Sequence, residues 1–584
     1  MGSFSPNIMA NHLHYIEKYN PRGEAVIYGE DRITWIELAR SARIIAQALI
    51  CLGVKKGDNV AFMFHNTPRF IEINLGIQVA GAIPVPVNYR FTGREIAYQV
   101  RHSDAAVFLY ESIWEEGVAE ARKELGDRLE MVCDGNSVPQ GVMAFSSFMD
   151  RGQNVDPKVP TGPEDAAAMI YTGGTTGLPK GVLLSYGAHI TMHASLFAHL
   201  ITYIAGMDIR MDQLLSVATA LPFPGIQHAI RLTQLKFVKK ILKKPLTSKL
   251  FTRILHFIMT HPETARFTYA KSLKFMVPTM PFFHDASYQL LILGLTLGNI
   301  TFVLVPGVHF EPENVFKTIL KEKPFFMANV PAGWKKMVSD PAVNEYDLDS
   351  IRICATGAGV ASPDLKKDML GTFKNALIFD MFGQTEMTPV TTFKVDVNIE
   401  TLKNRSVGRS IVDVRIVDEN GQDVPQGGAG EIVYKSGTRM MGYYKEKTKT
   451  DSSMLGGWFK SGDLGYMDSD GEIRLIDRKN ECINTGGEKV YPLEVEDVLH
   501  KHTCVESVCV IGVPDSVWGS SVRAVVVKKQ GCIVPEQELM DFCRGKLAGF
   551  KIPRSVIFIN NLPLSPVGKV LRAKIREQFG NPNG

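Results

Sequence analysis

The sequence predicts an α/β protein: a large N-terminal domain of βα-layered sheets with a small antiparallel β unit, followed by a small mobile α+β C-terminal domain. One reason is length, because 584 residues exceed what a single hydrophobic core organises. Short Val-, Ile- and Ala-rich runs also alternate with longer amphipathic runs over about 25–225 and 275–400, as in buried, mainly parallel strands joined by helices. Over about 405–480 the sequence changes to hairpins.

The composition is that of an ordinary globular protein. The net charge is only +4, so no overall field favours nucleic acid. The eight cysteines contain no Cys-x-x-Cys pair and no metal-ligand spacing, which indicates reduced thiols in a cytoplasmic protein. The first residues have no basic stretch followed by an apolar core, so a secretory signal is not expected. Residues 290–305 are apolar but interrupted by Gly298 and Asn299, which predicts a helix end and a buried strand instead of a membrane span.

In the N-terminal domain, strands are expected where short apolar runs are bounded by turn residues. These runs are 59–66, 81–87, 105–110, 166–172, 351–357 and 376–383. Two hairpins are expected in the antiparallel unit, because an Asn-Gly turn lies within 414–424 and an Asp-Gly turn within 465–478.

A domain boundary is predicted near Asn480, which divides the chain into residues 1–479 and 480–584. The C-terminal part has the order helix, strand, strand, helix, strand, helix. Its predicted elements are a helix that begins at Pro492, strands at 507–513 and 523–529, a helix at 536–547, a strand at 555–560 and a last helix.

Residues 226–276 differ from the rest of the chain in charge. They hold eleven Lys and Arg residues against one acid, Glu263, a net charge of +10. Projected as helices, they place apolar side chains on one arc and lysines on the other. Two interpretations stay open: a basic amphipathic insertion that binds an anionic membrane surface, or a helical insertion packed on its own protein with its lysines in solvent.

Residues 171–181, YTGGTTGLPKG, follow a predicted strand and combine glycines, threonines and one lysine. Glycines let backbone N–H groups approach a phosphate, threonine hydroxyls add donors, and a lysine supplies a cation for a polyphosphate. The P-loop pattern is not met, since Pro179 precedes Lys180 and Gly181 follows it. The loop predicts phosphate binding, and a flexible turn is the alternative. The candidate residues are Thr172, Gly173, Gly174, Thr175, Thr176, Gly177 and Lys180.

Two further strand ends carry candidate residues. The strand at 376–382 runs into Gly383, Thr385 and Glu386, and a hydroxyl and a carboxylate at a strand's carboxyl end suit a phosphate oxygen and a magnesium ion. The strand at 351–356 runs into small residues that leave room for a flat ligand. These are Gly357, Ala358 and Gly359.

Five ordered motifs resemble the adenylate-forming superfamily of acyl-CoA synthetases, non-ribosomal adenylation domains and luciferases. The resemblance covers about 25–575 without the 226–276 segment. The motifs are YTGGTTGLPKG, FGQTE (382–386), GWFKSGDLGYMDSDG (457–471), DRKNECINTGGEKVYPLEVE (477–496) and LPLSPVGKVLR (562–572).

The resemblance implies a role for each motif residue. Thr385 would contact the α-phosphate, Glu386 and Thr176 would hold Mg²⁺, and Phe382 would lie against adenine, next to Gly383 and Gln384. Many relatives have Tyr at the position of Phe382, so the stacking face is kept and a hydroxyl is lost.

The resemblance also assigns residues outside the FGQTE motif. Asp463 would accept hydrogen bonds from the ribose, Arg478 would reach the ribose or phosphate, and His284 would lie beside the acyl carboxylate. Lys569 would enter the site and neutralise charge during adenylation, and Gly486 and Gly487 would line the pantetheine channel. At the predicted hinge this chain has Asn480, where most relatives have Asp or Lys.

The implied reaction is ATP-dependent activation of a carboxylic acid to its CoA thioester through an acyl-adenylate, with ATP, Mg²⁺ and coenzyme A. A medium- or long-chain fatty acid is favoured. The segments 283–284, 329–333 and 354–359 contain no acidic or basic residue to pair with the ammonium group of an amino acid, so an amino-acid substrate is less expected. Aryl or alicyclic acids, transfer to a carrier protein and a non-catalytic membrane scaffold are the alternatives. A cytoplasmic location is expected, with peripheral contact to the inner face of a membrane through 226–276.

Overall fold

The fold is described from a computed structural model of the chain, which divides into two compact units. The first comprises Met1–Gly174, Leu178–Leu402 and Ser436–Ser452, and the second comprises Thr175–Gly177, Lys403–Lys435 and Ser453–Gly584. The structure describes residues 6–126, 129–172, 179–206, 211, 214–215, 217, 226–233, 235–242, 244–264, 272–298, 300–359, 361–402, 406–485, 488–515, 517–565 and 569–581.

The main sheet of the first unit is parallel except at its edges. Its strands follow the order β15-β14-β13-β12-β10-β11-β1-β2, and only β15 and β2 run antiparallel to their neighbours. The bounds are β1 Glu24–Tyr28, β2 Asp31–Thr34, β10 Leu273–Met276, β11 Ile300–Leu304, β12 Phe326–Asn329, β13 Ile353–Thr356, β14 Leu377–Phe382 and β15 Thr392–Asp396.

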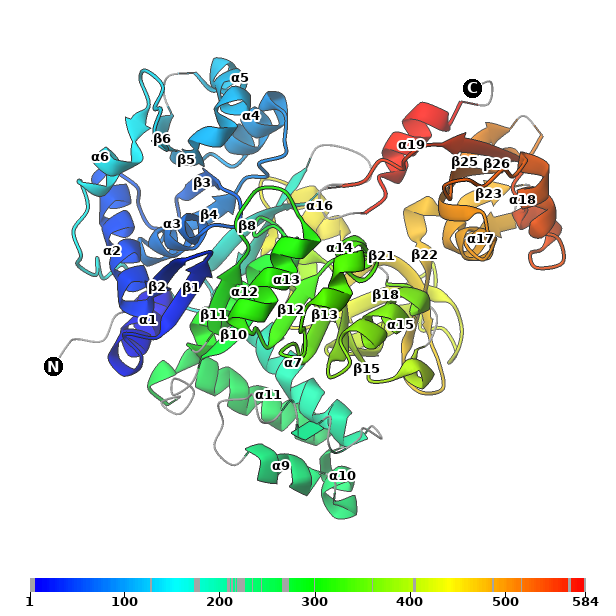
Figure 1. Ribbon diagram of the computed structural model, residues 1–584, viewed down its shortest axis with the longest axis horizontal. Coiled ribbons are helices and arrows are strands. Elements are labelled where there is room, and N and C mark those ends of the chain that lie inside the picture. Colours follow the sequence, from blue (N-terminus) through cyan, green and yellow to red (C-terminus); the bar gives the residue numbers. More distant parts are fainter. Residues whose placement is uncertain are drawn as a thin grey trace. The chain divides into compact units, whose positions relative to one another are not determined.

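A second parallel sheet has the order β4-β3-β5-β6-β7. Its apolar strands are joined by amphipathic helices, which is the predicted βα alternation (Figure 1). The bounds are α1 Ile8–Tyr19, α2 Trp35–Cys51, β3 Asn59–Met63, α3 Pro68–Val79, β4 Ile83–Pro86, α4 Gly93–His102, β5 Val107–Glu111, α5 Glu115–Leu125, β6 Glu130–Asp134, β7 Met143–Ala144 and α6 Phe145–Met149.

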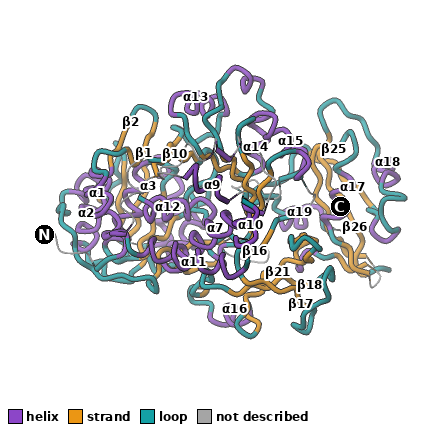
Figure 2. The backbone as a smooth tube through the Cα atoms, turned by 90° about the horizontal axis from the view of Figure 1, so that it is seen from below, coloured by secondary structure: helices purple, strands orange, loops and turns teal. Residues whose placement is uncertain are grey.

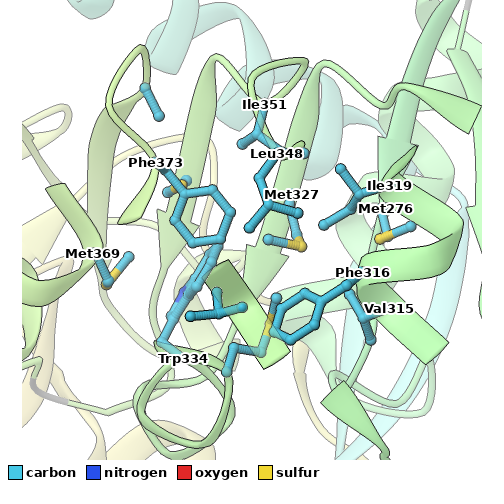
Figure 3. Close-up of a cluster of buried hydrophobic side chains, with 14 of the residues drawn as sticks. Met276, Val315, Phe316, Ile319, Met327, Trp334, Leu348, Ile351, Met369 and Phe373 are labelled. Carbon is cyan, nitrogen blue, oxygen red and sulfur yellow. The ribbon is translucent and has the colours of Figure 1, made fainter. Parts of the chain in front are cut away.

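The core of the main sheet lies under three helices that cover one of its faces. Side chains of α13 Pro312–Glu322, α14 Pro331–Val338 and α15 Pro363–Thr372 point toward those of the strands (Figure 3). Trp334 is fully buried there, and its indole Nε1 donates a hydrogen bond to the carbonyl of Ala355 at 3.1 Å. The indole therefore fills the core and also satisfies its only donor.

The Gly/Thr segment differs from the expected βα unit at one point. Strand β8 Ala166–Thr172 pairs antiparallel with β9 Lys180–Ser185, and β19 Gly442–Tyr443 adds to β9 as a third strand. The loop therefore closes a hairpin whose second strand continues into helix α7 Tyr186–Gly206.

The predicted insertion is helical. It contains α9 Ile226–Thr233, α10 Lys236–Leu242 and α11 Pro245–Thr260, and Figure 2 views the chain from their side. Helix α12 Asp285–Leu297 and strand β11 follow in the run that was predicted as helix end and buried strand. Among the described residues, none of the helices has the length and apolar content needed to cross a bilayer.

The second unit begins with the predicted antiparallel strands, β17 Asp413–Val417, β18 Gly430–Lys435, β20 Met454–Leu455, β21 Trp458–Met467 and β22 Ile473–Arg478. The α+β segment follows. Its elements are β23 Ile483–Thr485, β24 Glu488–Val490, α17 Pro492–Leu499, β25 Val505–Asp515, β26 Gly519–Lys528, α18 Glu536–Phe542, β27 Ser555–Ile559 and α19 Arg572–Phe579. This segment has the predicted order from α17 onward, and a pair of short strands that was not predicted, β23 and β24, precedes it.

Candidate active site

The carboxyl ends of four parallel strands define one edge of the main sheet. Strands β10, β12, β13 and β14 are neighbours, and in their register Asn329 lies opposite Thr356, which lies opposite Asp380. The segments after these strands therefore leave from the same edge, where α/β proteins place their ligands. His284, Gly357 and Glu386 all follow strands of this group.

Two glycines allow the backbone to approach closely at this edge. A Cβ added to Gly383 would lie 2.0 Å from the carbonyl oxygen of Pro389, and one added to Gly357 would lie 3.0 Å from that of Met381. Ala358, which follows Gly357, has a φ of +60°, a left-handed conformation that is uncommon outside glycine. A side chain is thus excluded at Gly383 and crowded at Gly357 by the backbone of neighbouring segments, whereas Gly359 has only ordinary contacts.

Glu386 lies in a short 3₁₀ helix, Thr385–Met387, directly after β14. Its Oε1 accepts a hydrogen bond from the hydroxyl of Tyr443 at 2.7 Å. The amino group of Lys180 lies 5.0 Å from the centre of the same Tyr443 ring, within the range of a cation–π contact. Tyr443 therefore links the predicted phosphate-binding lysine to the predicted magnesium ligand.

Backbone hydrogen bonds hold these three elements together. Tyr444 N donates to Gly181 O at 2.8 Å, and Met440 N donates to Glu386 O at 2.8 Å. Strand β19 is thereby fixed between β9 and the 3₁₀ helix. Burial and the charge of Glu386 raise the pKa of the Tyr443 hydroxyl, so it stays a donor to the carboxylate.

The predicted phosphate loop is described at its two ends. Thr172 lies directly opposite Lys180 in the hairpin register. Five predicted residues, Gly173, Gly174, Thr175, Thr176 and Gly177, lie outside the described residues, as do Gly486 and Gly487 of the predicted pantetheine channel.

His284 is the N-cap residue of the apolar helix α12, without a capping hydrogen bond from its side chain, and the next residue is a carboxylate that was not predicted as a site residue. Asp285 is only 2% exposed, and neither of its oxygens has a hydrogen-bond partner among the described residues. Burial, followed by the charge of Glu386, raises the pKa of Asp285 well above its ordinary value. The first unit therefore holds a second acidic group close enough to Glu386 to sense its charge.

Two predicted ribose-binding residues pair with each other in the second unit. Asp463 and Arg478 are opposite in the register of β21 and β22, and Arg478 Nε lies 2.7 Å from Asp463 Oδ1. The carboxylate is buried and the guanidinium is more exposed. The pair gives the carboxylate a fixed orientation.

Lys569 is hydrogen-bonded to Ser565 in the second unit. Its N–H donates to Ser565 Oγ at 3.1 Å, and Ser565 N donates to its carbonyl at 2.6 Å. The residue is exposed. Three residues later, Arg572 Nη2 contacts Glu496 Oε1 at 2.5 Å. This contact joins the start of α19 to α17.

Sequence reasoning missed Tyr443 and Asp285. Tyr443 is 57 positions from Glu386 in the sequence, and a Gly-Tyr pair before a charged loop gives no signal of that contact. Asp285 also gave no signal, since acids are common in the first turn of a helix, and only the structure shows that this one is buried. The described residues contain no cluster of three or more His, Cys, Asp or Glu side chains that could hold a metal.

These features, a nucleotide-type site at parallel strand ends followed by a small α+β segment, define an adenylate-forming enzyme. The family description "AMP-binding enzyme" matches residues 15–223 and 253–444, and "AMP-binding enzyme C-terminal domain" matches 494–569. The chain belongs to this AMP-binding enzyme family, as its motifs predicted.

Relatives match along nearly the whole chain. A feruloyl-CoA synthase of Amycolatopsis is 28% identical over 96% of this chain and 97% of its own length. A long-chain-fatty-acid–CoA ligase of Bacillus subtilis is 27% identical over 96% and 92%. Among solved structures, an anthranilate CoA ligase in complex with anthranoyl-AMP has a TM-score of 0.76 at 22% identity, covering 99% of this chain and 98% of that one. This last similarity concerns the fold.

Proposed function

We propose that the protein is an ATP-dependent acyl-CoA synthetase. In the first half-reaction, a carboxylate oxygen of the acid attacks the α-phosphorus of ATP, the bond to the β-phosphate breaks, and pyrophosphate leaves. In the second, the CoA thiol loses its proton and its sulfur attacks the acyl carbon, and AMP leaves. The observation that carries the proposal is the linkage of Lys180, Tyr443 and Glu386 at the carboxyl ends of the main sheet.

The chain's own residues bind and orient the nucleotide. Lys180 and the Gly/Thr loop hold the β- and γ-phosphates, Thr385 contacts the α-phosphate, and Phe382 lies against adenine. Asp463, oriented by Arg478, accepts from the ribose hydroxyls. Catalysis arises from positioning and from charge compensation by Lys569.

Magnesium would be held by Glu386. Mg²⁺ prefers carboxylate oxygens, and Glu386 offers a carboxylate whose orientation is fixed by the Tyr443 hydroxyl, as outer-sphere partners fix metal ligands in general. Bound there, the ion would neutralise phosphate charge. Thr176, the other predicted ligand, lies outside the described residues.

The C-terminal segment would move between the two half-reactions. In the first, it brings Lys569 to the reacting groups. In the second, it turns about Asn480 and presents Gly486 and Gly487 to pantetheine. Asn tolerates unusual backbone angles, which suits a hinge.

The favoured substrate is a medium- or long-chain fatty acid. The apolar character of the segments near His284 supports it, as does similarity to fatty-acid–CoA ligases. An aryl acid is the second candidate. Similarity to a feruloyl-CoA synthase supports it. Peripheral contact with the inner face of a membrane would place the enzyme near fatty acids.

Hydroxylamine trapping of acyl-adenylates over a panel of fatty and aryl acids tests the proposal. Hydroxamate should form with ATP and Mg²⁺, and a thioester should replace it when CoA is added. A carrier protein with phosphopantetheine serves as the competing acceptor. If hydroxamate forms but no CoA thioester does, CoA is not the acyl acceptor. If no acid leads to AMP release, the whole proposed function is contradicted.

A further inference from the structure

Helix α11 has apolar side chains on two opposite faces. Its inner face packs on α7 and α12, where buried Met259 and neighbouring Leu255 contact Ile190, Ala194 and Leu297. Its outer face carries side chains at a helical spacing that all lie in solvent. The exposed residues are Leu246, Lys249, Leu250, Arg253, Ile254 and Phe257.

Helix α10 repeats this pattern. Lys236, Phe237, Lys240 and Ile241 are exposed, whereas Leu242 is buried. Phe237 is 74% exposed and Leu246 of α11 is 77% exposed. Both helices therefore present large apolar side chains and cations together on the surface, in contrast to the segregated arcs of the helical projection.

The exposed residues of α9–α11 form what we call the basic–apolar patch. It consists of Arg231, Leu232, Leu235, Lys236, Phe237, Lys240, Ile241, Lys244, Leu246, Lys249, Leu250, Arg253, Ile254 and Phe257. The sequence contains no acid between residues 226 and 262. Single exposed apolar residues are common, but a group of this kind marks an interaction surface.

Most of the patch, from Arg231 to Leu250, lies in a segment that the family match leaves out. The matches to the family leave out 224–252, which includes α9, α10 and the first half of α11. In Figure 1 these helices lie at the lower edge of the first unit. The patch is therefore an addition to the adenylate-forming fold that the catalytic elements do not need for their own packing.

We infer that the basic–apolar patch docks on the surface of an anionic lipid bilayer. Apolar side chains enter the headgroup region, while Lys and Arg keep their charges at the level of the lipid phosphates. Charge complementarity identifies the partner, since the patch has cations and no acids. Interleaved Leu, Ile and Phe side chains favour lipid over nucleic acid, which takes cations and stacking aromatics. This inference deepens the proposed membrane contact.

Vesicle flotation of the full chain tests the inference. The wild type should float with phosphatidylcholine–phosphatidylglycerol vesicles and remain below with phosphatidylcholine alone. Lys236→Glu/Lys240→Glu/Lys249→Glu should weaken binding to anionic vesicles by about tenfold or more. The matched control, Lys123→Glu/Lys367→Glu/Lys374→Glu, changes three exposed lysines elsewhere and should bind like the wild type.

An apolar variant tests the other component. Phe237→Ser/Leu246→Ser/Phe257→Ser should weaken binding to anionic vesicles to a similar extent. The control Ile113→Ser/Val155→Ser/Leu320→Ser changes three exposed apolar residues elsewhere and should bind like the wild type. Point variants are preferable to deletion, because deletion would remove Met259 from the core. Circular dichroism and adenylation of a soluble acid verify folding.

Three results would overturn the inference. The first is that the wild type does not float with anionic vesicles, and the second is that the patch and control variants lose vesicle binding equally. The third is a wild-type dimer that the apolar variant converts to a monomer while neither protein floats. The test is independent of catalysis. If the protein floats but adenylates no acid, the docking surface stands and the proposed function fails.

Discussion

At the scale of single residues, Tyr443 has the most consequential contact of the site. Its hydroxyl orients Glu386, and its ring faces Lys180. Tyr443→Phe should weaken the apparent affinity for Mg²⁺ about tenfold, because the ligand loses its orienting partner. Adenylation rates titrated against free Mg²⁺ at saturating ATP measure this.

Tyr444→Phe is the matched control for that variant. The Tyr444 hydroxyl bonds to Asp104, 2.9 Å away, and not to Glu386. Its magnesium dependence should equal that of the wild type. An unchanged magnesium titration in Tyr443→Phe would show that Glu386 does not need the hydroxyl.

Asp285 makes stability depend on pH in a defined direction. Its raised pKa means that the folded protein keeps a proton that the unfolded chain has lost. Stability therefore falls as pH rises from the unfolded pKa to the folded one, by about 1.4 kcal/mol per pH unit. Asp285→Asn removes this slope, so the difference in unfolding free energy between the variant and the wild type should grow in favour of the variant as the pH rises above the ordinary pKa of an Asp carboxyl.

Urea unfolding of both proteins across this pH range provides the measurement. The exposed Asp368 of α15 supplies the control, because Asp368→Asn should follow the wild-type curve. If the free energies of unfolding of Asp285→Asn and the wild type differ by the same amount at every pH, the pKa of Asp285 is not raised in the folded protein.

At the scale of elements, α19 is held by buried charges. Arg572 bonds to Glu496, whose Oε1 also accepts from Val510 N at 2.7 Å, and Arg576 pairs with Glu481. Arg572→Met leaves Glu496 buried without its cation, a type of loss that costs about 3–5 kcal/mol. Amide hydrogen exchange in β25 and β26 should accelerate accordingly, whereas exposed Lys574→Met on the same helix should leave it unchanged.

Most elements could be predicted from the sequence because their signals are local. Apolar runs and Asn-Gly or Asp-Gly turns identify strands such as β14 and the β21–β22 hairpin. The antiparallel pairing of β8 with β9 could not be predicted, because a Gly-rich loop precedes a strand or a helix equally well. The contact of Glu386 with Tyr443 depends on a two-residue strand, β19, whose pairing with β9 is long-range.

The interpretation of 226–276 shows the same limit. Its helices follow from periodicity, but a projection cannot tell which of several apolar positions face the protein. In α11, Leu250 and Leu255 both fit an apolar arc, yet Leu250 is exposed and Leu255 packs in the core. Packing on α7 decides between them.

At the scale of the whole molecule, the proposed movement of the C-terminal segment separates the two half-reactions. Lys569→Ala should lower adenylation by about 100-fold or more and leave CoA transfer from supplied acyl-adenylate nearly intact. Single-turnover assays of each half-reaction distinguish them, and Lys574→Ala is the surface control. Equal losses in both half-reactions, or normal adenylation, would remove Lys569 from its role.

The packing of α11 on α7 has a mechanical consequence. Helix α7 begins at Tyr186, immediately after the strand that starts with Lys180. If α11 binds a lipid bilayer as proposed, the helix on which it packs, α7, continues directly from the hairpin that carries Lys180, so lipid binding and nucleotide binding would act on one continuous segment. Enzyme kinetics recorded with and without liposomes should accordingly be treated as properties of two different working states.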